Sequence, residues 1–516
     1  MNLPPFKKSP DKPYVTYNEP DFIAPPDDQQ GRVPFGLTRR NGKTYYRYLN
    51  ATEDTKGIVI VAKAGQGKTT LINITLSTAL SQIGIVPGVR AILQDPKQEN
   101  ARILRAMGVP YKALNPYLKE FAAFDVSSVV TNKSKAQIFT LMLMLKTELS
   151  QLSEFWDQQV FRLISSIIES LIVMKSEGAI AFWDFRYIIL ALDSIIYVDE
   201  NPDCAEFATL IRYCSQYEAV LQSLQGKTGR SVVQSAKGVM AVWSVIAARY
   251  DRATERVSLA DWQDTVFLFG TSMDNEAVIN FLNRFIFTEI ANYLRGLPEQ
   301  LPGDPPRKVY NIIDEGLSLL PLPQIDKLME IGRSKDVCTI ITLLNIAGLQ
   351  HKPEFRTEGT RAFLDLFRHY VVLGVSRADA QFLVDNVFGY RSGTRYNPVF
   401  DYERVPDPTN PTRYHKKRVV VDYRATTFTG EPRVPVEDLV NIPPANAANG
   451  TTGYFYSPQM FSEFATYTAD DYFTLCPYVK HLAEVDSEPD ALIDASDPSL
   501  YELRPFDSSE RQQLGL

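Results

Sequence analysis

The stretch GIVIVAKAGQGKTTLINITLSTAL, residues 57–80, decides the fold of this chain. It opens with the apolar run IVIV, which is long enough for one buried strand. Small residues that suit a loop come next, followed by a segment with the composition of a helix. A strand, a glycine-rich loop and a helix in this order form the context of a P-loop. Glycines allow backbone N–H groups to converge on phosphate oxygens, and the helix N-terminus adds positive dipole. The stretch therefore predicts a nucleotide-binding domain of the α/β class.

The residues of this P-loop have separate predicted roles. The Lys68 ammonium would reach the β- and γ-phosphates of ATP, and the Thr69 hydroxyl would bind Mg²⁺. Ala62 stands where the pattern GxxxxGK[ST] has its first glycine, a position that a small residue can fill. The predicted nucleotide-binding residues are Ala62, Lys63, Ala64, Gly65, Gln66, Gly67, Lys68, Thr69 and Thr70.

A second stretch, KVYNIIDE at residues 308–315, places two acids directly after an apolar run. Downstream of a P-loop, this is the Walker B pattern. Asp314 would hold Mg²⁺ through its water shell, because Mg²⁺ gives up its water reluctantly. Glu315 would orient and polarise the attacking water. The two stretches together predict an ATPase with ATP and Mg²⁺ as its cofactors.

Further apolar runs at residues 89–94, 265–269, 337–344 and 367–375 predict strands that alternate with helices. This alternation indicates a mainly parallel sheet covered by helices on both faces. Asp95 and Lys97 follow the first of these runs. Because the carboxyl ends of strands face the ligand crevice in such sheets, they could lie near the nucleotide or at a subunit interface. A purely structural turn explains them equally well.

Residues 133–256 have a different character, since apolar residues recur there at helical spacing and strand patterns are sparse. We predict an inserted all-α domain with helices over residues 138–149, 155–174, 182–196, 207–224 and 231–248. Its aromatic residues Trp156, Phe161, Trp183 and Trp243 are expected in the core. The glycine-rich residues 226–230 are expected to form a break between helices, and no strand precedes them as a second P-loop would require.

The two ends of the chain and one internal segment complete the predicted organisation. We expect an extended arm over 1–31, a first part of the nucleotide-binding domain over 32–132, its second part over 257–460, and an acidic tail over 461–516. Asn41-Gly42 predicts a hairpin turn within residues 32–49. A longer hairpin with a basic segment is predicted at about 395–428. Either hairpin could contact nucleic acid or simply present a solvated face.

Composition excludes several classes of protein. The 516 residues suffice for about three domains, and the formal net charge of −7 does not suggest a protein coated in nucleic acid. The four cysteines have no metal-ligand spacing, which fits a reducing compartment. No secretory signal and no run of 18 apolar residues is present, so we expect a cytoplasmic protein.

Several segments together resemble one family, the coupling ATPases of type IV secretion and conjugation (TraG/TraD-like proteins), within the FtsK/HerA group of DNA motors. The matching segments are AKAGQGKTT, LQDPKQEN, NPYLKEFAAFDV, FWDQQVFRLISSIIESLI, IIDEGLSL, MEIGRSKDVCTIITLLNIAGLQ and VPVEDLVNIPPANAANGTTGYFY. They cover roughly residues 30–460 in the family's order. The resemblance implies a RecA-like P-loop motor domain that assembles as a homo-hexamer, with ATP between neighbouring subunits and DNA in the centre.

The resemblance also assigns two further residues. By position, Arg333 is a candidate for an arginine supplied in trans to the γ-phosphate, although a surface cation at a helix end explains it as well. Asn345 stands where the family has a sensor glutamine, and its side chain is one methylene shorter. The family's usual N-terminal membrane helices are not found, so we expect either a soluble relative or a protein held at the cytoplasmic face of the membrane by a separate anchor protein, through the arm or the acidic tail.

The function that follows is an ATP-driven motor delivering DNA, without sequence preference, or a relaxase-type nucleoprotein cargo to a conjugative apparatus. Two other hypotheses stay open. One is another FtsK/HerA-type DNA pump for packaging, segregation or defence. The other is a nucleotide-gated adaptor that recruits cargo without working as a motor.

Overall fold

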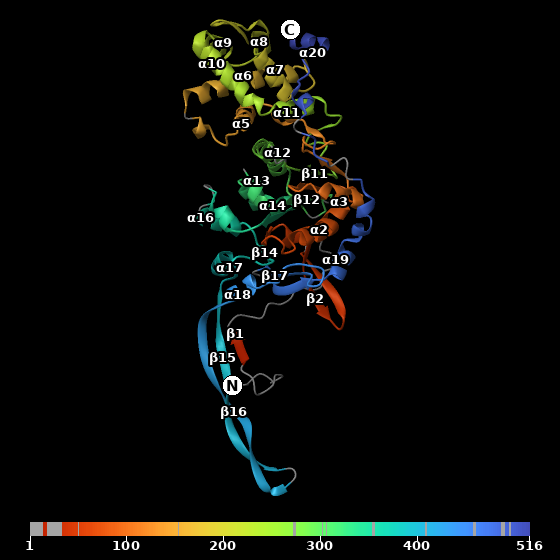
Figure 1. Cartoon of the computed structure of the whole chain (residues 1–516), viewed down its shortest axis with the longest axis vertical. Coiled ribbons are helices and arrows are strands. Elements are labelled where there is room, and N and C mark those ends of the chain that lie inside the picture. The colour runs from red at the N-terminus through yellow and green to blue at the C-terminus, as the bar shows by residue number, and fades with distance from the viewer. Residues whose placement is uncertain are drawn as a thin grey trace.

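The computed structural model describes residues 14–17, 33–49, 51–152, 154–271, 275–301, 303–305, 307–322, 324–352, 355, 357–407, 410–457, 461–486, 491–494 and 497–516. The molecule is elongated, with a mainly helical end, a central sheet layered with helices, and a long hairpin at the opposite end (Figure 1). The central layer holds the nucleotide-binding stretch.

A nine-stranded sheet forms the central layer, in the order β18-β17-β14-β4-β13-β12-β5-β11-β6. The strands from β14 to β6 run parallel, and β17 and β18 add an antiparallel edge. Their bounds, in sheet order, are Phe461–Tyr467, Thr451–Ser457, His369–Val372, Ile58–Val61, Val337–Leu343, Lys308–Ile313, Val89–Gln94, Val266–Phe269 and Tyr111–Ala113. The predicted α/β fold with a mainly parallel sheet is confirmed.

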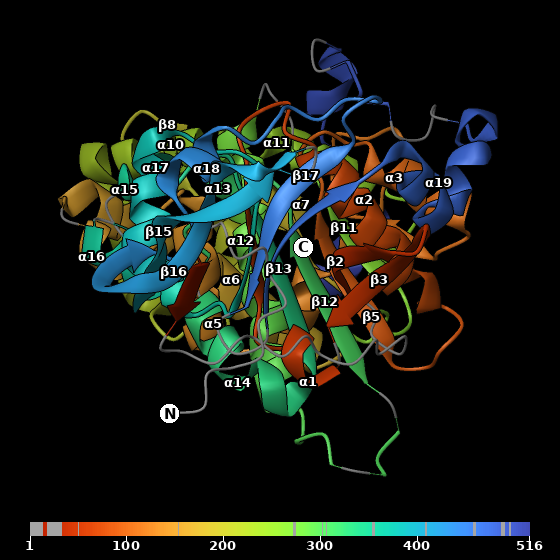
Figure 2. The same cartoon turned by 90° about the horizontal axis from the view of Figure 1, so that it is seen from below.

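Each face of the sheet has its own hydrophobic core because successive residues of a buried strand point to opposite faces. In β4, Val59 and Val61 face the core that includes α12 (Glu276–Gly296) and α14 (Ile325–Lys335). Ile58 and Ile60 face α2 (Lys68–Ala79) and α3 (Asn100–Met107). Figure 2 shows α2 and α3 on one side of β12 and β13, and α12 on the other.

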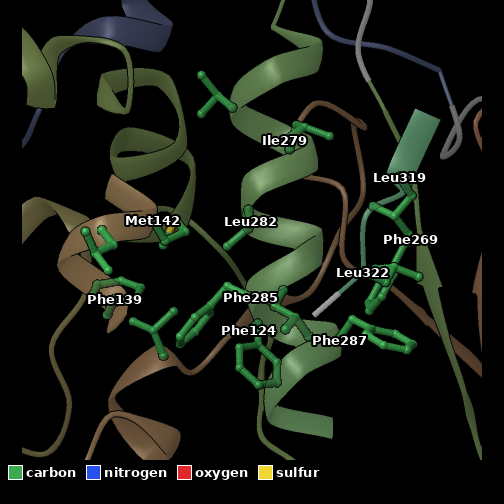
Figure 3. Close-up of a cluster of buried hydrophobic side chains, with 14 of the residues drawn as sticks. Phe124, Phe139, Met142, Phe269, Ile279, Leu282, Phe285, Phe287, Leu319 and Leu322 are labelled. Atoms are coloured by element: carbon green, nitrogen blue, oxygen red, sulfur yellow. The ribbon is translucent and has the colours of Figure 1, made fainter. Parts of the chain in front are cut away.

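Helix α12 connects the sheet with the helical end. Its residues Leu282 and Phe285 point towards Phe139 and Met142 of α5, while Phe287 lies towards the sheet side of the helix (Figure 3). One continuous core therefore runs from the sheet into the helical end.

The helical end contains seven helices among the described residues between 133 and 251, and one short hairpin of β8 (Ile196–Val198) and β9 (Asn201–Asp203), so the prediction of an all-α insert holds except for this hairpin. The helices are α5 (Lys133–Leu143), α6 (Phe155–Ser176), α7 (Phe185–Asp193), α8 (Ala205–Leu210), α9 (Tyr217–Ser223), α10 (Gly226–Ala241) and α11 (Ser244–Asp251). The chain enters after β7 (Ala123–Phe124) and leaves at β10 (Arg256–Val257), and these two short strands pair with each other. Entry and exit thus lie side by side, as an insertion requires.

Four predictions about this helical end are wrong. Residues 226–230 are the first turn of α10 rather than a break, because Val232, Val233, Ala236 and Met240 line a buried stripe at helical spacing. Residues 207–224 form two short helices instead of one. Residues 231–248 are likewise divided, between α10 and α11. Trp156 is 42% exposed and pairs with the exposed ring of Phe155, whereas Trp183 and Trp243 are fully buried as expected.

Two hairpins extend from the sheet layer. The predicted turn at Asn41-Gly42 joins β2 (Val33–Arg40) to β3 (Lys43–Leu49). The predicted basic hairpin is confirmed and is longer than expected, with β15 (Tyr390–Asp407) and β16 (Asn410–Pro432). Within the predicted arm 1–31, β1 (Tyr14–Tyr17) pairs with β15 as a third strand; the rest of that arm lies outside the described residues.

The interpretation of residues 461–516 as an acidic tail is wrong for its described parts at both ends. Strand β18 belongs to the central sheet, and α19 (Ala469–Leu475) packs beside α2. At the far end, α20 (Ser508–Leu514) docks on the helical domain, where the Arg186 side chain is 1% exposed and donates two hydrogen bonds of 2.8 Å to Glu510. The acidic residue thus neutralises a buried guanidinium rather than facing solvent.

Among the described helices, none by itself is long and apolar enough to cross a membrane. Helices α10 and α11, which are bent by 64° at their junction, have together the length and the apolar composition of a membrane span, and no other observation supports one.

Candidate nucleotide-binding site

The P-loop lies at the carboxyl end of β4, in the middle of the sheet. Its start remains tied to the neighbouring strands, since Ala62 N donates to Leu343 O and Lys63 N to Gly374 O, both at 3.0 Å. Gly65 and Gly67 then adopt φ angles of 76° and 86°. Side chains rarely adopt this left-handed region, so glycine is needed at both turns. The chain thereby bends into α2, whose first residue is Lys68.

Lys68 is the residue whose surroundings most strongly indicate an anionic ligand. Its side chain is buried, its Nζ lies 3.9 Å from Asp314 Oδ1, and it has no hydrogen-bond partner within the described part of the chain. Burial lowers the pKa of Lys68 below its usual value, although Asp314 and Glu315 act in the opposite direction. A buried ammonium without hydrogen bonds is costly, and an anionic ligand removes that cost. Thr69 and Thr70 follow at the half-buried N-terminus of α2, where the helix dipole also favours phosphate.

Asp314 and Glu315 follow directly after β12. Asp314 Oδ1 accepts hydrogen bonds from Thr342 Oγ1 at 2.6 Å and from Glu315 N at 2.9 Å. Among the described residues nothing bonds its second oxygen, which leaves that oxygen for a metal-bound water. Glu315 itself adopts a left-handed φ of 50° and turns its carboxylate towards the β5 side of the sheet. The pair thus has one acid fixed beside Lys68 and one aimed across the crevice.

Lys97 is a residue of this site that the sequence left undecided. Its Nζ lies 3.3 Å from Glu315 Oε1. Burial alone lowers the pKa of Lys97, but the Glu315 carboxylate outweighs that effect and the pKa is raised. The neighbouring Asp95 has the structural role instead: it is buried, accepts a hydrogen bond from Asn100 N at 2.8 Å, and its pKa is raised to about 7 by burial. Lys97 therefore belongs to the nucleotide site, whereas Asp95 stabilises the turn after β5.

The two residues assigned by resemblance lie at opposite ends of the parallel strands, Asn345 after the carboxyl end of β13 and Arg333 before its amino end. Asn345 follows β13 at the P-loop edge, and its side-chain oxygen accepts a hydrogen bond from Gly348 N, which leaves its amide group to donate. Arg333 is exposed in the last turn of α14. Because this helix leads into the start of β13, Arg333 lies at the amino ends of the strands, away from the P-loop. Arg333 is therefore outside this chain's own site, and its role in trans stays a prediction.

A wall of the site comes from the C-terminal part of the chain, which sequence reasoning missed. Ala445 N donates to Gly65 O at 3.1 Å, and an added Cβ on Gly67 would come within 2.5 Å of Thr451 Oγ1. A cavity of about 380 Å³ opens between the P-loop and this wall; it is lined by Gly65, Gly67, Thr70, Asn446, Thr451, Tyr467, Tyr472 and Phe473 among others. Its glycine edge suits phosphate, and its aromatic edge suits a planar ring.

The chain is similar to known proteins in sequence over one segment and in fold over nearly its whole length. Residues 216–423 match the family model of the type IV secretion-system coupling protein DNA-binding domain. The chain resembles the type IV secretion-system coupling proteins. The matched segment runs from α9 through the Walker B residues into β16 and does not include the P-loop. No curated protein sequence matches the chain.

Solved structures of a coupling protein share the fold over nearly the whole chain. The bacterial conjugative coupling protein TrwBdeltaN70, in its unbound monoclinic form, superposes with a TM-score of 0.55 and 16% sequence identity, covering 89% of this chain and 95% of its own. The plasmid coupling protein TrwB in complex with ADP and Mg²⁺ gives a TM-score of 0.55 and 16% identity, covering 90% of this chain and 96% of its own. TrwB with the non-hydrolysable GTP analogue GDPNP gives 0.55 and 15%, with 90% and 96% covered.

Proposed function

We propose that this chain is an ATP-hydrolysing coupling protein that delivers DNA, or a nucleoprotein substrate, to a type IV secretion-like conjugative apparatus. The observation that carries the proposal is the buried Lys68 ammonium, which lies between a P-loop and the Walker B acids and makes no hydrogen bond to any described residue. The match of residues 216–423 to a coupling-protein DNA-binding domain supports DNA as the substrate. TrwB, which shares the fold, was crystallised with ADP and Mg²⁺, so ATP and Mg²⁺ are the cofactors that we propose here.

Each residue of the site has a role in the proposed reaction. The P-loop N–H groups and the Lys68 ammonium hold the β- and γ-phosphates. Thr69 and Asp314 would hold Mg²⁺, which supplies charge neutralisation at the phosphates when it is bound. Glu315 orients the attacking water and accepts its proton. We assign γ-phosphate sensing to the Asn345 amide, which follows β13 and donates no hydrogen bond to any described residue.

The assembly is part of the same proposal. We infer a homo-hexamer that tracks DNA phosphates without sequence preference, as expected of a motor held by backbone contacts. We assign to the exposed Arg333, in the last turn of α14, the role of an arginine supplied to a neighbour's nucleotide, where it would stabilise transition-state charge. The complex works in the cytoplasm, with a relaxase-type cargo and a separate membrane anchor as further proposed partners.

The test is the ATPase rate at fixed low salt with and without single- and double-stranded DNA. Salt is held constant because phosphate-driven binding falls steeply with ionic strength. We expect DNA to stimulate the wild type, Glu315→Gln to bind ATP without turnover, and Lys68→Ala to lose both. Stimulated hydrolysis that survives in Glu315→Gln would refute the assignment. A wild type that binds ATP but shows no stimulation would favour the nucleotide-gated adaptor.

A further inference from the structure

The hairpin of β15 and β16 is the longest structural feature of the chain and has no role in the nucleotide site. Its strands contain 18 and 23 residues. At about 3.3 Å per residue, the shorter strand spans about 60 Å. Figure 1 shows that the hairpin leaves the sheet layer and forms the end of the molecule opposite to the helical domain. Most of its length is therefore a two-stranded ribbon with both faces available.

The register assigns the residues of the outer hairpin to two different faces. Directly opposed residues of an antiparallel pair share a face, and residues two apart along a strand share it as well. Phe400 pairs with Val420, Tyr402 with Arg418, and Arg404 with Lys416. We call this set the Tyr402 face. The positions between them form the other face and include Asp401, Glu403 and Lys417.

The two faces differ in charge. The Tyr402 face carries three cations, Arg404, Lys416 and Arg418, and no acid over this stretch. The opposite face balances its cations with the acids Asp401, Glu403 and Asp422. A solvated ribbon has no need for such segregation, because mixed charges keep both faces soluble.

The side chains of the Tyr402 face are also arranged for contact. Tyr402 is 62% exposed, and Arg404, Lys416 and Arg418 are exposed. Within the described part of the chain, no acidic side chain pairs with these three cations. The Arg418 guanidinium lies 3.4 Å from the centre of the Phe400 ring, which fixes its plane over the aromatic surface. Towards the base, the same face continues with Tyr396 and Tyr423.

We propose that the Tyr402 face binds single-stranded nucleic acid. Three cations beside one exposed ring, Tyr402, and an arginine plane stacked on the half-buried Phe400 match a strand that offers phosphates and unpaired bases in turn, since bases stack on aromatic rings and on arginine planes. A duplex hides its bases from stacking, and an anionic membrane needs the cations but not the rings. The proposal adds a contact that is separate from the nucleotide site, and it rests on the proposed function only in taking DNA as the natural strand.

The experiment measures binding of a fluorescein-labelled oligothymidylate by anisotropy, without nucleotide, over a series of salt concentrations. The test variant combines Arg404→Gln, Lys416→Gln and Arg418→Gln. A matched control removes three cations from the opposite face with Arg395→Gln, Lys417→Gln and Arg424→Gln. Both variants lose the same net charge, so a difference between them reports the face. A second test variant, Tyr402→Ala, removes the exposed ring alone.

We expect the test variant to bind at least tenfold more weakly than the control at low salt. Its log–log salt slope should fall by about 2, since each phosphate contact on a single strand contributes about 0.7. Tyr402→Ala should weaken binding about tenfold at every salt concentration, because base stacking does not release ions. Thermal unfolding of the variants at the wild-type temperature shows that the fold is kept.

Several outcomes would overturn the proposal. Equal affinities of the test variant, control and wild type would place the contact elsewhere and leave the proposed function intact. Equal losses in test variant and control would show a net-charge effect. An equal loss on a duplex probe would exclude single-strand selectivity, and a loss confined to phosphatidylserine vesicles would assign the face to a membrane. A wild type that binds no DNA would contradict the proposed function itself.

Discussion

Acidification should destabilise the sheet through one buried histidine. His369, the first residue of β14, is fully buried, and its Nε2 lies 2.9 Å from Glu53 O. Its Nδ1 is buried without a partner in the described structure, and the Phe35 ring lies against it at 5.4 Å between centres. Burial, only partly opposed by Glu53, lowers the pKa of His369 to about 4. The folded sheet therefore keeps this imidazole neutral.

The expected loss of stability follows from the two pKa values. The unfolded chain protonates this histidine below about pH 6.5, whereas the folded chain does so only below about pH 4. Between these values the unfolded state binds more protons, so the free energy of unfolding decreases as the pH falls. The loss amounts to about 2 kcal/mol at pH 5 and approaches about 3.4 kcal/mol below pH 4, at 1.36 kcal/mol per unit.

Native-state hydrogen exchange measures this effect locally, which is preferable because a protein of this size need not unfold in two states. The amides of β14 should show an opening free energy about 2 kcal/mol lower at pH 5 than at pH 7.5. Other carboxylates titrate in the same range, so the comparison is with His369→Gln, which has no ionisation at this position. If the wild type and His369→Gln lose the same free energy, the burial argument is refuted.

Three further perturbations test other parts of the structure. Gly67→Ala should abolish nucleotide binding and lower the unfolding temperature, since its Cβ meets the chain that covers the P-loop; Gly65→Ala, with open space around it, should cost only about 1 kcal/mol in backbone strain. Lys97→Met should lower kcat for ATP hydrolysis roughly ten- to a hundredfold and leave KM unchanged, because only the orientation of Glu315 is lost. Lys97→Arg should restore kcat. A change in KM alone would argue for a direct contact between Lys97 and a phosphate. Arg186→Met should release α20, and its opening free energy in hydrogen exchange should fall by about 3 kcal/mol. Unchanged protection of α20 would show that the buried Arg186–Glu510 pair does not hold this helix in place.

The parts of the fold that the sequence predicts are those whose signals are local. The apolar run before Ala62, the glycines of the loop and the acids after Ile313 lie within short stretches, and each stretch folds as predicted. For Lys97 the sequence predicts only a position near the carboxyl ends of the strands. Its contact with Glu315 depends on β5 lying next to β12, which no spacing along the chain reveals.

The errors have physical causes as well. The glycines at 226 and 229 favour a turn by intrinsic propensity, yet tertiary burial of Val233 and Ala236 makes the segment helical. Trp156 has the residue type of a core anchor but lies on the outer side of α6. The wall over the P-loop and the strand β18 come from segments nearly 400 residues away, and their alternating aromatic residues indicate strands without indicating where they pair.

The C-terminal segment gives the helical domain a third attachment to the sheet layer. The first two are the paired strands β7 and β10, where the chain enters and leaves. The third passes Tyr117, whose carbonyl accepts a 2.8 Å hydrogen bond from Ile493 N, and ends at the buried Arg186–Glu510 pair. The core that α12 shares with α5 already resists rotation of the helical domain about the line of these two strands, and an attachment away from that line resists it further. We therefore expect that a movement of the strands that carry the nucleotide site displaces the helical domain as a rigid body.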